Sequence, residues 1–203
     1  MRSSGRNFVL TMVLIVAVLV FAWTLIHAAY YAPDGVPVPA TPTATAFGQN
    51  VATTSLPSRL IIPALNINAN VQDLGVNSIG NMQAPDNFTD VGWYKYGTVP
   101  GQLGSAVIDG HVDNGLGLAG VFKQLDSIKI GDDLYVQTVG GQKLHFVVSD
   151  IETYPYQSVP VQTIFAQTDA ARLNLITCDG TWVNGQDTYN ERLVVYTKYV
   201  GTG

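Results

Sequence analysis

The sequence contains one cysteine, Cys178, and a lone thiol is the first group in it that can act as a nucleophile. It follows the apolar run 173–177 and precedes the turn-forming pair Asp179-Gly180, so we expect it at the end of a strand, where a loop begins. There the strand would hold the residue while the sulfur is exposed. The alternative is a buried structural thiol, because free cysteine is among the most buried residue types.

An arginine lies where it can assist this thiol. The next strand is predicted to begin at Arg192. If the two strands pair as a hairpin around residues 179–191, the guanidinium lies close to Cys178. A fixed positive charge at that place suits a thiolate or a developing oxyanion.

A thiol nucleophile also needs a proton partner, and the sequence has three histidines. His27 belongs to an apolar N-terminal segment and is excluded. His145 lies in the middle of a predicted strand, where a structural or solvent-facing side chain is expected. His111 ends the apolar run 106–110 and enters a glycine-rich loop, so it is the histidine that we expect beside the thiol.

Acidic residues flank these positions but do not predict a metal site. Asp109, Asp113 and Asp179 could each orient a catalytic group, although an aspartate at a strand end is more often a turn former. The adjacent pair Asp132-Asp133 is a weak signal for calcium. With a single cysteine, neither an intramolecular disulfide nor a cysteine-based zinc cluster can form. We therefore predict no metal and no cofactor.

The elements that position these residues are predicted to be strands within a catalytic domain at residues 58–203. Short apolar runs recur between turn signals, and Gly140-Gly141 joins two of them as a hairpin. Helical turns are expected only at 118–128 and around 168–171. Many closely spaced strands with little helix predict an all-β fold, a small closed or nearly closed β-barrel.

A membrane segment is predicted before this domain, at residues 8–29. Its first 19 residues carry no charge, and about 20 apolar residues cross a bilayer as a helix. Arg2 and Arg6 precede it, which predicts a cytoplasmic N-terminus at residues 1–7 and an extracytoplasmic domain. The alternative is a cleaved signal peptide, whose apolar region is usually shorter.

Residues 30–57, between the membrane segment and the catalytic domain, are rich in proline, threonine and alanine. This composition predicts a stalk. Over the whole chain the net charge is −5, which argues against binding to nucleic acid. Charged residues make up only 12%, which argues against a disordered chain and against a charged helical bundle.

The order histidine, cysteine, arginine resembles that of sortases, the cysteine transpeptidases of bacterial cell surfaces. The resemblance rests on the histidine in DGHVD, the cysteine in LNLITC and the arginine in YNERLVVY. LNLITC is similar to the family pattern T-L-x-T-C, with Asn174 in place of the first threonine. The stretch GHVDNGLGLAGVF is most similar to class F sortases.

This resemblance implies an eight-stranded sortase barrel and an LPxTG-type sorting signal as substrate, carried by secreted proteins. It implies that Cys178 attacks the Thr–Gly carbonyl, that His111 transfers protons and that Arg192 holds the substrate and the oxyanion. It also implies substrate contacts at Thr177, Val161 and Ile164. The acceptor would be a peptidoglycan precursor or pilin amine, and the enzyme would be a single-pass protein of the bacterial cell membrane.

Other classes of protein are alternatives to this assignment. An L,D-transpeptidase also uses Cys, His and Arg, but its Cys and Arg lie two positions apart, whereas Cys178 and Arg192 are 14 apart. Papain-like and NlpC-type hydrolases place the cysteine before the histidine, the opposite of this order. The other alternative is a membrane-anchored β-domain without enzymatic activity, which serves adhesion or sensing.

Overall fold

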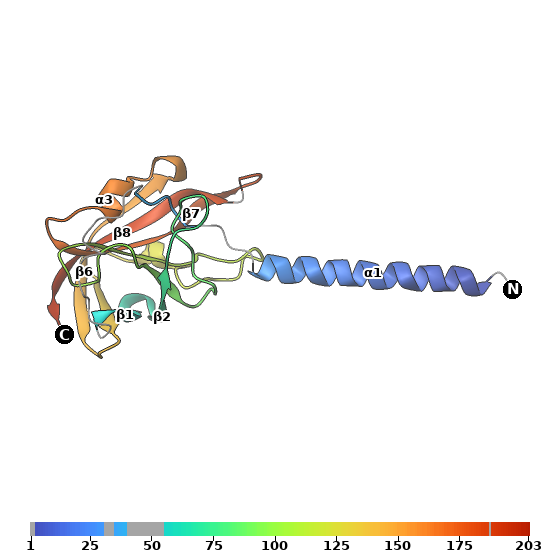
Figure 1. Ribbon diagram of the computed structural model, residues 1–203, viewed down its shortest axis with the longest axis horizontal. Coiled ribbons are helices and arrows are strands. Elements are labelled where there is room, and N and C mark those ends of the chain that lie inside the picture. Colours follow the sequence, from blue (N-terminus) through green and yellow to red (C-terminus); the bar gives the residue numbers. More distant parts are fainter. Residues whose placement is uncertain (1–2, 31–34, 40–54, 187) are drawn as a thin grey trace.

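The computed structural model describes residues 3–30, 35–39, 55–186 and 188–203. Helix α1, Ser3–Tyr30, projects from one side of a β-barrel (Figure 1). Its segment Asn7–Ala29 has a mean hydropathy of 2.8 and is long and apolar enough to cross a membrane, a property that a signal sequence shares. The boundaries predicted for the cytoplasmic end, the anchor and the stalk stay predictions.

Eight strands close into the barrel in the order β1-β2-β3-β4-β7-β8-β6-β5, which confirms the predicted all-β class. The strands are β1 Pro57–Ile62, β2 Ile67–Leu74, β3 Val91–Tyr94, β4 Gly104–Asp109, β5 Asp133–Thr138, β6 Lys143–Pro155, β7 Ala171–Val183 and β8 Thr188–Thr202. Two neighbouring pairs, β2–β3 and β4–β7, are parallel, and the others are antiparallel.

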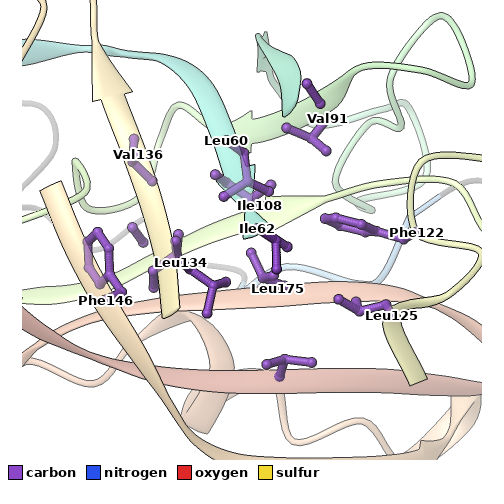
Figure 2. Close-up of a cluster of buried hydrophobic side chains, with 14 of the residues drawn as sticks. Leu60, Ile62, Val91, Ile108, Phe122, Leu125, Leu134, Val136, Phe146 and Leu175 are labelled. Atoms are coloured by element: carbon purple, nitrogen blue, oxygen red, sulfur yellow. The ribbon is translucent and has the colours of Figure 1, made fainter. Parts of the chain in front are cut away.

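The inside of the barrel is filled by alternate residues of these strands, since successive side chains of a strand point to opposite faces. Leu175 of β7 and Ile108 of β4 belong to this interior cluster, together with the other side chains that Figure 2 labels. Close packing of these side chains holds the strands in register and so fixes where each strand delivers its polar residues.

A second apolar cluster lies on the outer face of the barrel, and we call it the outer cluster. Its buried members are Val36, Leu74, Met82, Tyr94, Val107, Ile164, Phe165, Ile176 and Val194. They come from strands β2, β3, β4, β7 and β8, from helix α3 (Val161–Phe165) and from two segments outside these elements. The same strands therefore bury apolar side chains on both of their faces.

The short helices differ in part from the expectation. Within 118–128 only Leu125–Ser127 (η3) is helical, preceded by turns. The helical turn expected around 168–171 is wrong: residues 169 and 170 are bends, Ala171 begins β7, and α3 ends shortly before them at Phe165. Further 3-10 turns lie at Pro63–Leu65 (η2) and Tyr156–Ser158 (η4).

Candidate active site

Cys178 and Arg192 lie directly opposite each other in the β7–β8 hairpin. They are partners in the antiparallel register, next to the pair Thr177 and Leu193. The expected proximity of thiol and guanidinium is thus found. The expectation that the strand ends at Cys178 is wrong, because β7 crosses an irregularity after Asp179 and continues to Val183. A bulge of this kind bends the strand and re-aims its side chains.

His111 reaches the same edge of the barrel through the parallel pair β4–β7. Asp109 of β4 is level with Ile176 of β7. The amide of Gly110 donates to the Ile176 carbonyl at 3.3 Å, and the Thr177 hydroxyl donates to the Gly110 carbonyl at 2.8 Å. His111 follows directly at this end of β4, and its imidazole and the Arg192 guanidinium both lie close enough to Asp109 to lower the pKa of that carboxyl. Parallel neighbours deliver their carboxyl ends to one edge, which explains why residues so far apart in sequence meet here.

The imidazole of His111 is fixed from the loop that precedes β3. Its Nε2 lies 2.8 Å from the Pro85 carbonyl oxygen, and its ring packs on Phe88 with centroids 4.8 Å apart. A carbonyl only accepts hydrogen bonds, so this contact requires the hydrogen on Nε2 and leaves Nδ1 as the free nitrogen of the neutral ring. His111 is only 6% exposed, so the ring cannot swing freely.

Arg192 is 1% exposed, and its guanidinium is held by its own strand. Nη1 donates to the carbonyl oxygens of Glu191 and Tyr189 at 2.8 and 3.0 Å, and Nη2 donates to the Thr188 hydroxyl at 2.8 Å. The guanidinium also lies over the ring of Tyr156 in η4, 4.3 Å from the centroid. The cation is therefore positioned before any ligand arrives.

Electrostatics at the thiol favour its neutral form. Burial raises the pKa of Cys178 to about 12, and the carboxylates of Asp109, Asp113 and Asp179 add to the rise. Arg192 opposes them and lowers the pKa. The thiolate is thus a minor species at neutral pH, and a base must take the proton as the sulfur attacks.

Asp109 is a buried carboxyl on the same face of the sheet as these groups. It is 8% exposed and lies two residues after Val107, a member of the outer cluster. Burial raises its pKa, while His111 and Arg192 oppose that rise. Cys178 lies two residues after Ile176, and Arg192 lies two residues before Val194, so both face the same side of the sheet as the outer cluster. The reactive groups therefore extend the outer cluster at one end.

A cleft of about 360 Å³ opens beside Cys178. Its lining includes Asp113, Lys123, Asp179 and Tyr189. Asp113 accepts hydrogen bonds from the Tyr189 hydroxyl at 2.6 Å and from Lys123 at 2.9 Å. Burial, with Asp113 beside it, raises the pKa of Tyr189. Among the described residues, no group of three or more His, Cys, Asp or Glu side chains is arranged to hold a metal ion.

The residues predicted to bind substrate lie in two places. Thr177 is 2% exposed, and its hydroxyl is already bonded to Gly110, so its side chain ties β7 to the end of β4. Ile164 of α3 is fully buried in the outer cluster, and the partly buried Val161 packs against that cluster. Substrate contacts at these three positions stay predictions.

His145 lies apart from the other groups. It pairs with Tyr135 and Gly201 in the sheet, whereas Arg192 pairs with Tyr154 near the opposite end of β6. Its Nε2 lies 2.7 Å from Asp133 and its ring stacks on Tyr135.

Sequence reasoning missed the residues that hold the reactive groups. The contacts of Pro85 and Phe88 with His111 carry no motif, because they join a loop to a residue more than 20 positions away. Tyr156 over Arg192 belongs to a stretch, YPYQ, whose aromatic content alone could have suggested packing on a cation.

Comparison with known proteins supplies the family. A search of curated proteins finds no match. Solved structures with the same fold include sortase C1 of Streptococcus agalactiae (22% identity, TM-score 0.57, covering 78% of this chain and 83% of that one). Another is sortase C-1 of Actinomyces oris (24%, 0.57, 83% and 88%), and a third is sortase A of Listeria monocytogenes (21%, 0.55, 73% and 89%). The sortase domain model matches residues 60–200, and on this match the chain belongs to the sortase family.

Proposed function

We propose that this protein is a membrane-anchored cysteine transpeptidase, with Cys178, His111 and Arg192 as its catalytic residues. Its substrate is an LPxTG-type sorting signal at the C-terminus of a secreted protein, cleaved between Thr and Gly. The observation that carries the proposal is the direct cross-strand pairing of Cys178 with Arg192, at the barrel edge where β4 also delivers His111.

In the first half of the reaction, His111 accepts the thiol proton as Sγ of Cys178 attacks the threonine carbonyl carbon. The carbonyl oxygen becomes an oxyanion, and the fixed guanidinium of Arg192 stabilises that negative charge. The Thr–Gly C–N bond then breaks, and His111 returns the proton to the leaving amine. The products are a thioester on Cys178 and the released C-terminal fragment.

In the second half, an acceptor amine attacks the thioester carbon and gives its proton to His111. The C–S bond breaks, and the Cys178 sulfur takes a proton back, so the enzyme is regenerated and a new amide joins the protein to the acceptor. A peptidoglycan precursor or a pilin amine is the proposed acceptor. The neutral resting thiol fits this scheme, because the proton that His111 carries is the one that Cys178 loses.

The protein would act at the outer surface of a bacterial membrane, with α1 as its anchor and the N-terminus in the cytoplasm. The apolar segment Asn7–Ala29 supports the anchor, and the two arginines before it support the orientation. Assignment to class F rests on the GHVD stretch alone and belongs to this proposal.

The test uses the full chain in detergent micelles, a set of LPxTG-type peptides and several amines, with products read by mass spectrometry. We expect a product in which the N-terminal part of the peptide is joined to an amine, and none with Cys178→Ala. A fold-retaining chain that binds the peptides without making product would favour a binding domain instead. Product formation by Cys178→Ala would contradict the assigned nucleophile.

A further inference from the structure

The loop that follows His111 ends in an exposed apolar segment, residues 115–119, which we call the tip. Leu116 and Leu118 within it are 47% and 62% exposed, and residues 114–122 carry no charge. Exposed apolar side chains that gather on one loop mark a contact surface. The tip is therefore a surface in search of an apolar partner.

The backbone of the tip is bonded within the loop itself. Oδ1 of Asn114 accepts from the amides of Leu116 and Leu118 at 2.9 and 3.0 Å. The amide of Asn114 donates to the Leu118 carbonyl at 3.0 Å, and the amide of Gly117 donates to the Asn114 carbonyl at 2.8 Å. Backbone groups that are already paired lose little when they leave water, so this loop can enter an apolar medium at low cost.

The charged residues nearest the tip compensate each other at its base. Lys123 donates to Asp113 at 2.9 Å, and the Asp113 side chain is only 10% exposed. Asp113 and Ala119 form a β-bridge, which places this ion pair where the loop leaves the barrel. An uncompensated charge is costly next to hydrocarbon, and the tip itself presents none.

The same loop contacts the end of the apolar helix. Nδ2 of Asn114 donates to the Ala29 carbonyl of α1 at 3.1 Å. A β-carbon on Gly115 would lie 2.5 Å from the Ala28 carbonyl oxygen, so only glycine allows this close approach. Figure 1 shows the yellow-green connection beside the barrel end of α1. The tip thus lies next to the point where α1 meets the barrel.

The length of α1 sets the level of this contact relative to a bilayer. The apolar segment Asn7–Ala29 has 23 residues. A helix of that length rises about 35 Å, whereas the hydrocarbon core is about 30 Å thick. Ala28 and Ala29 therefore lie close to the outer boundary of the hydrocarbon. The ring of Trp23, which packs on His27 with centroids 5.5 Å apart, suits the same interface.

We propose that the tip inserts Leu116 and Leu118 into the outer lipid interface beside α1, so that the membrane holds the catalytic edge of the barrel at its surface. This inference rests on the membrane anchor in the proposed function. The loop that carries the tip begins at His111, and Asp113 at its base lines the cleft beside Cys178. The reacting groups then lie close to the lipid surface, where an amine carried on a lipid is presented.

The first test measures where the tip lies. Cys178→Ala removes the only thiol of the chain, so one introduced cysteine can carry an environment-sensitive fluorescent label. Leu118→Cys places the label on the tip. Leu103→Cys is the matched control, because Leu103 is 66% exposed and lies just before β4, at the end of that strand opposite to His111. Both full-length chains are inserted into phosphatidylcholine–phosphatidylglycerol vesicles, with or without lipids that carry a nitroxide quencher near the headgroup.

We expect the quencher to reduce the fluorescence of the label at position 118 several-fold and to leave the label at position 103 almost unchanged. Equal quenching at the two positions would overturn the proposal. Blue-shifted emission at position 118 without quenching would also overturn it, because the tip would then contact protein, such as a second copy of the chain. So would an intact mass that shows α1 removed by cleavage, since nothing would then hold the tip at the bilayer.

The second test measures what the contact does for the reaction. The double variant Leu116→Ser/Leu118→Ser is compared with Leu103→Ser and with the wild type in the same vesicles. One acceptor amine is attached to a lipid headgroup and the other is soluble. We expect the double variant to raise KM several-fold for the lipid-attached amine and to leave KM and kcat unchanged for the soluble amine.

The two tests separate this inference from the proposed function. An equal change with both amines would refute positioning at the membrane and leave the transpeptidase intact. If the wild type forms no product with either amine, the proposed transpeptidation fails. The labelled chains lack Cys178 and need no activity, so their quenching decides the membrane contact in either case.

Discussion

The two faces of the β7–β8 hairpin have different roles, although their residues alternate along the same strands: one packs the interior of the barrel and the other carries reactive groups. Leu193 points into the barrel and belongs to the interior cluster, whereas its neighbour Arg192 points outward and pairs with Cys178. The interior face is mostly apolar, and the hydroxyl of its buried Thr177 donates to the Gly110 carbonyl. The outer face begins in the apolar outer cluster and ends in the thiol of Cys178 and the guanidinium of Arg192, beside the Asp109 carboxyl and the His111 imidazole at the end of β4.

This difference shows how one element holds a site and builds a core at the same time. The interior face contributes free energy of folding through buried apolar area. The outer face places polar groups where a packed backbone leaves them little freedom, which is what transition-state stabilisation requires. Substitutions on the two faces should therefore affect different measurements.

The largest effect is expected from His111→Ala. Loss of the His111 imidazole removes the proposed acceptor for the thiol proton, and general acid–base catalysis contributes roughly 10²- to 10⁴-fold to rate. We expect kcat/KM for an LPxTG-type peptide to fall by at least that factor, with the unfolding temperature close to that of the wild type. Turnover within tenfold of the wild type would contradict the role of His111.

The direct comparison of the faces uses the adjacent substitutions Arg192→Lys and Leu193→Ala. Lysine keeps the charge but loses the fork of donors, and removal of an oxyanion-hole donor lowers kcat about 10²- to 10³-fold. Leu193→Ala should instead reduce the free energy of unfolding by about 2–5 kcal/mol and leave kcat within a few-fold below the melting transition. Chemical denaturation and kinetics on both chains provide the test, and the reverse assignment of effects would overturn the two-face account.

A smaller and graded effect is expected in the pH dependence of Cys178 alkylation. Burial raises the pKa of the thiol to about 12, so the reactive thiolate grows with pH throughout the accessible range. We expect the rate constant with iodoacetamide to rise about tenfold per pH unit between roughly pH 7 and 10, without a plateau. The urea-unfolded chain should level off about where a free thiol ionises, near pH 8.5. A plateau of the folded chain below about pH 8 would mean that the site stabilises the thiolate instead.

The smallest effect is expected from His145→Ala. This side chain lies near the start of β6 and contacts Asp133 and Tyr135 of β5, so its loss should leave kcat and KM within a few-fold of the wild type. Its removal should lower the free energy of unfolding by less than about 1 kcal/mol, as expected for a partly exposed pair. Loss of activity in a folded His145→Ala chain would show that the wrong histidine had been chosen.

The sequence predicted those features that depend on local pattern. Alternating apolar runs and glycine turns predicted the strands, and the hairpin between 173–178 and Arg192 predicted the cross-strand pair. The end of β7 was misplaced because Asp179-Gly180 reads as a turn, whereas the strand accommodates it as an irregularity and continues. The helix expected around 168–171 was misplaced for a similar reason, since tertiary packing of α3 decided which short segment is helical.

Long-range contacts could not be predicted in this way. Nothing near His111 indicates that Pro85 fixes its tautomer, and the proline-rich composition that suggested a passive stalk gives no sign that Val36 is buried. Both depend on which surfaces meet after the barrel has closed, and residue spacing along the chain does not encode that.

The most direct test of the central claim is the intact mass of the full chain after brief incubation with an LPxTG-type peptide and no added amine, followed by acid quench and peptide mapping. We expect an adduct with the mass of the peptide up to its threonine, carried on Cys178 through a thioester and absent from Cys178→Ala. A peptide adduct mapped to any other residue, or product that forms in Cys178→Ala, would contradict it.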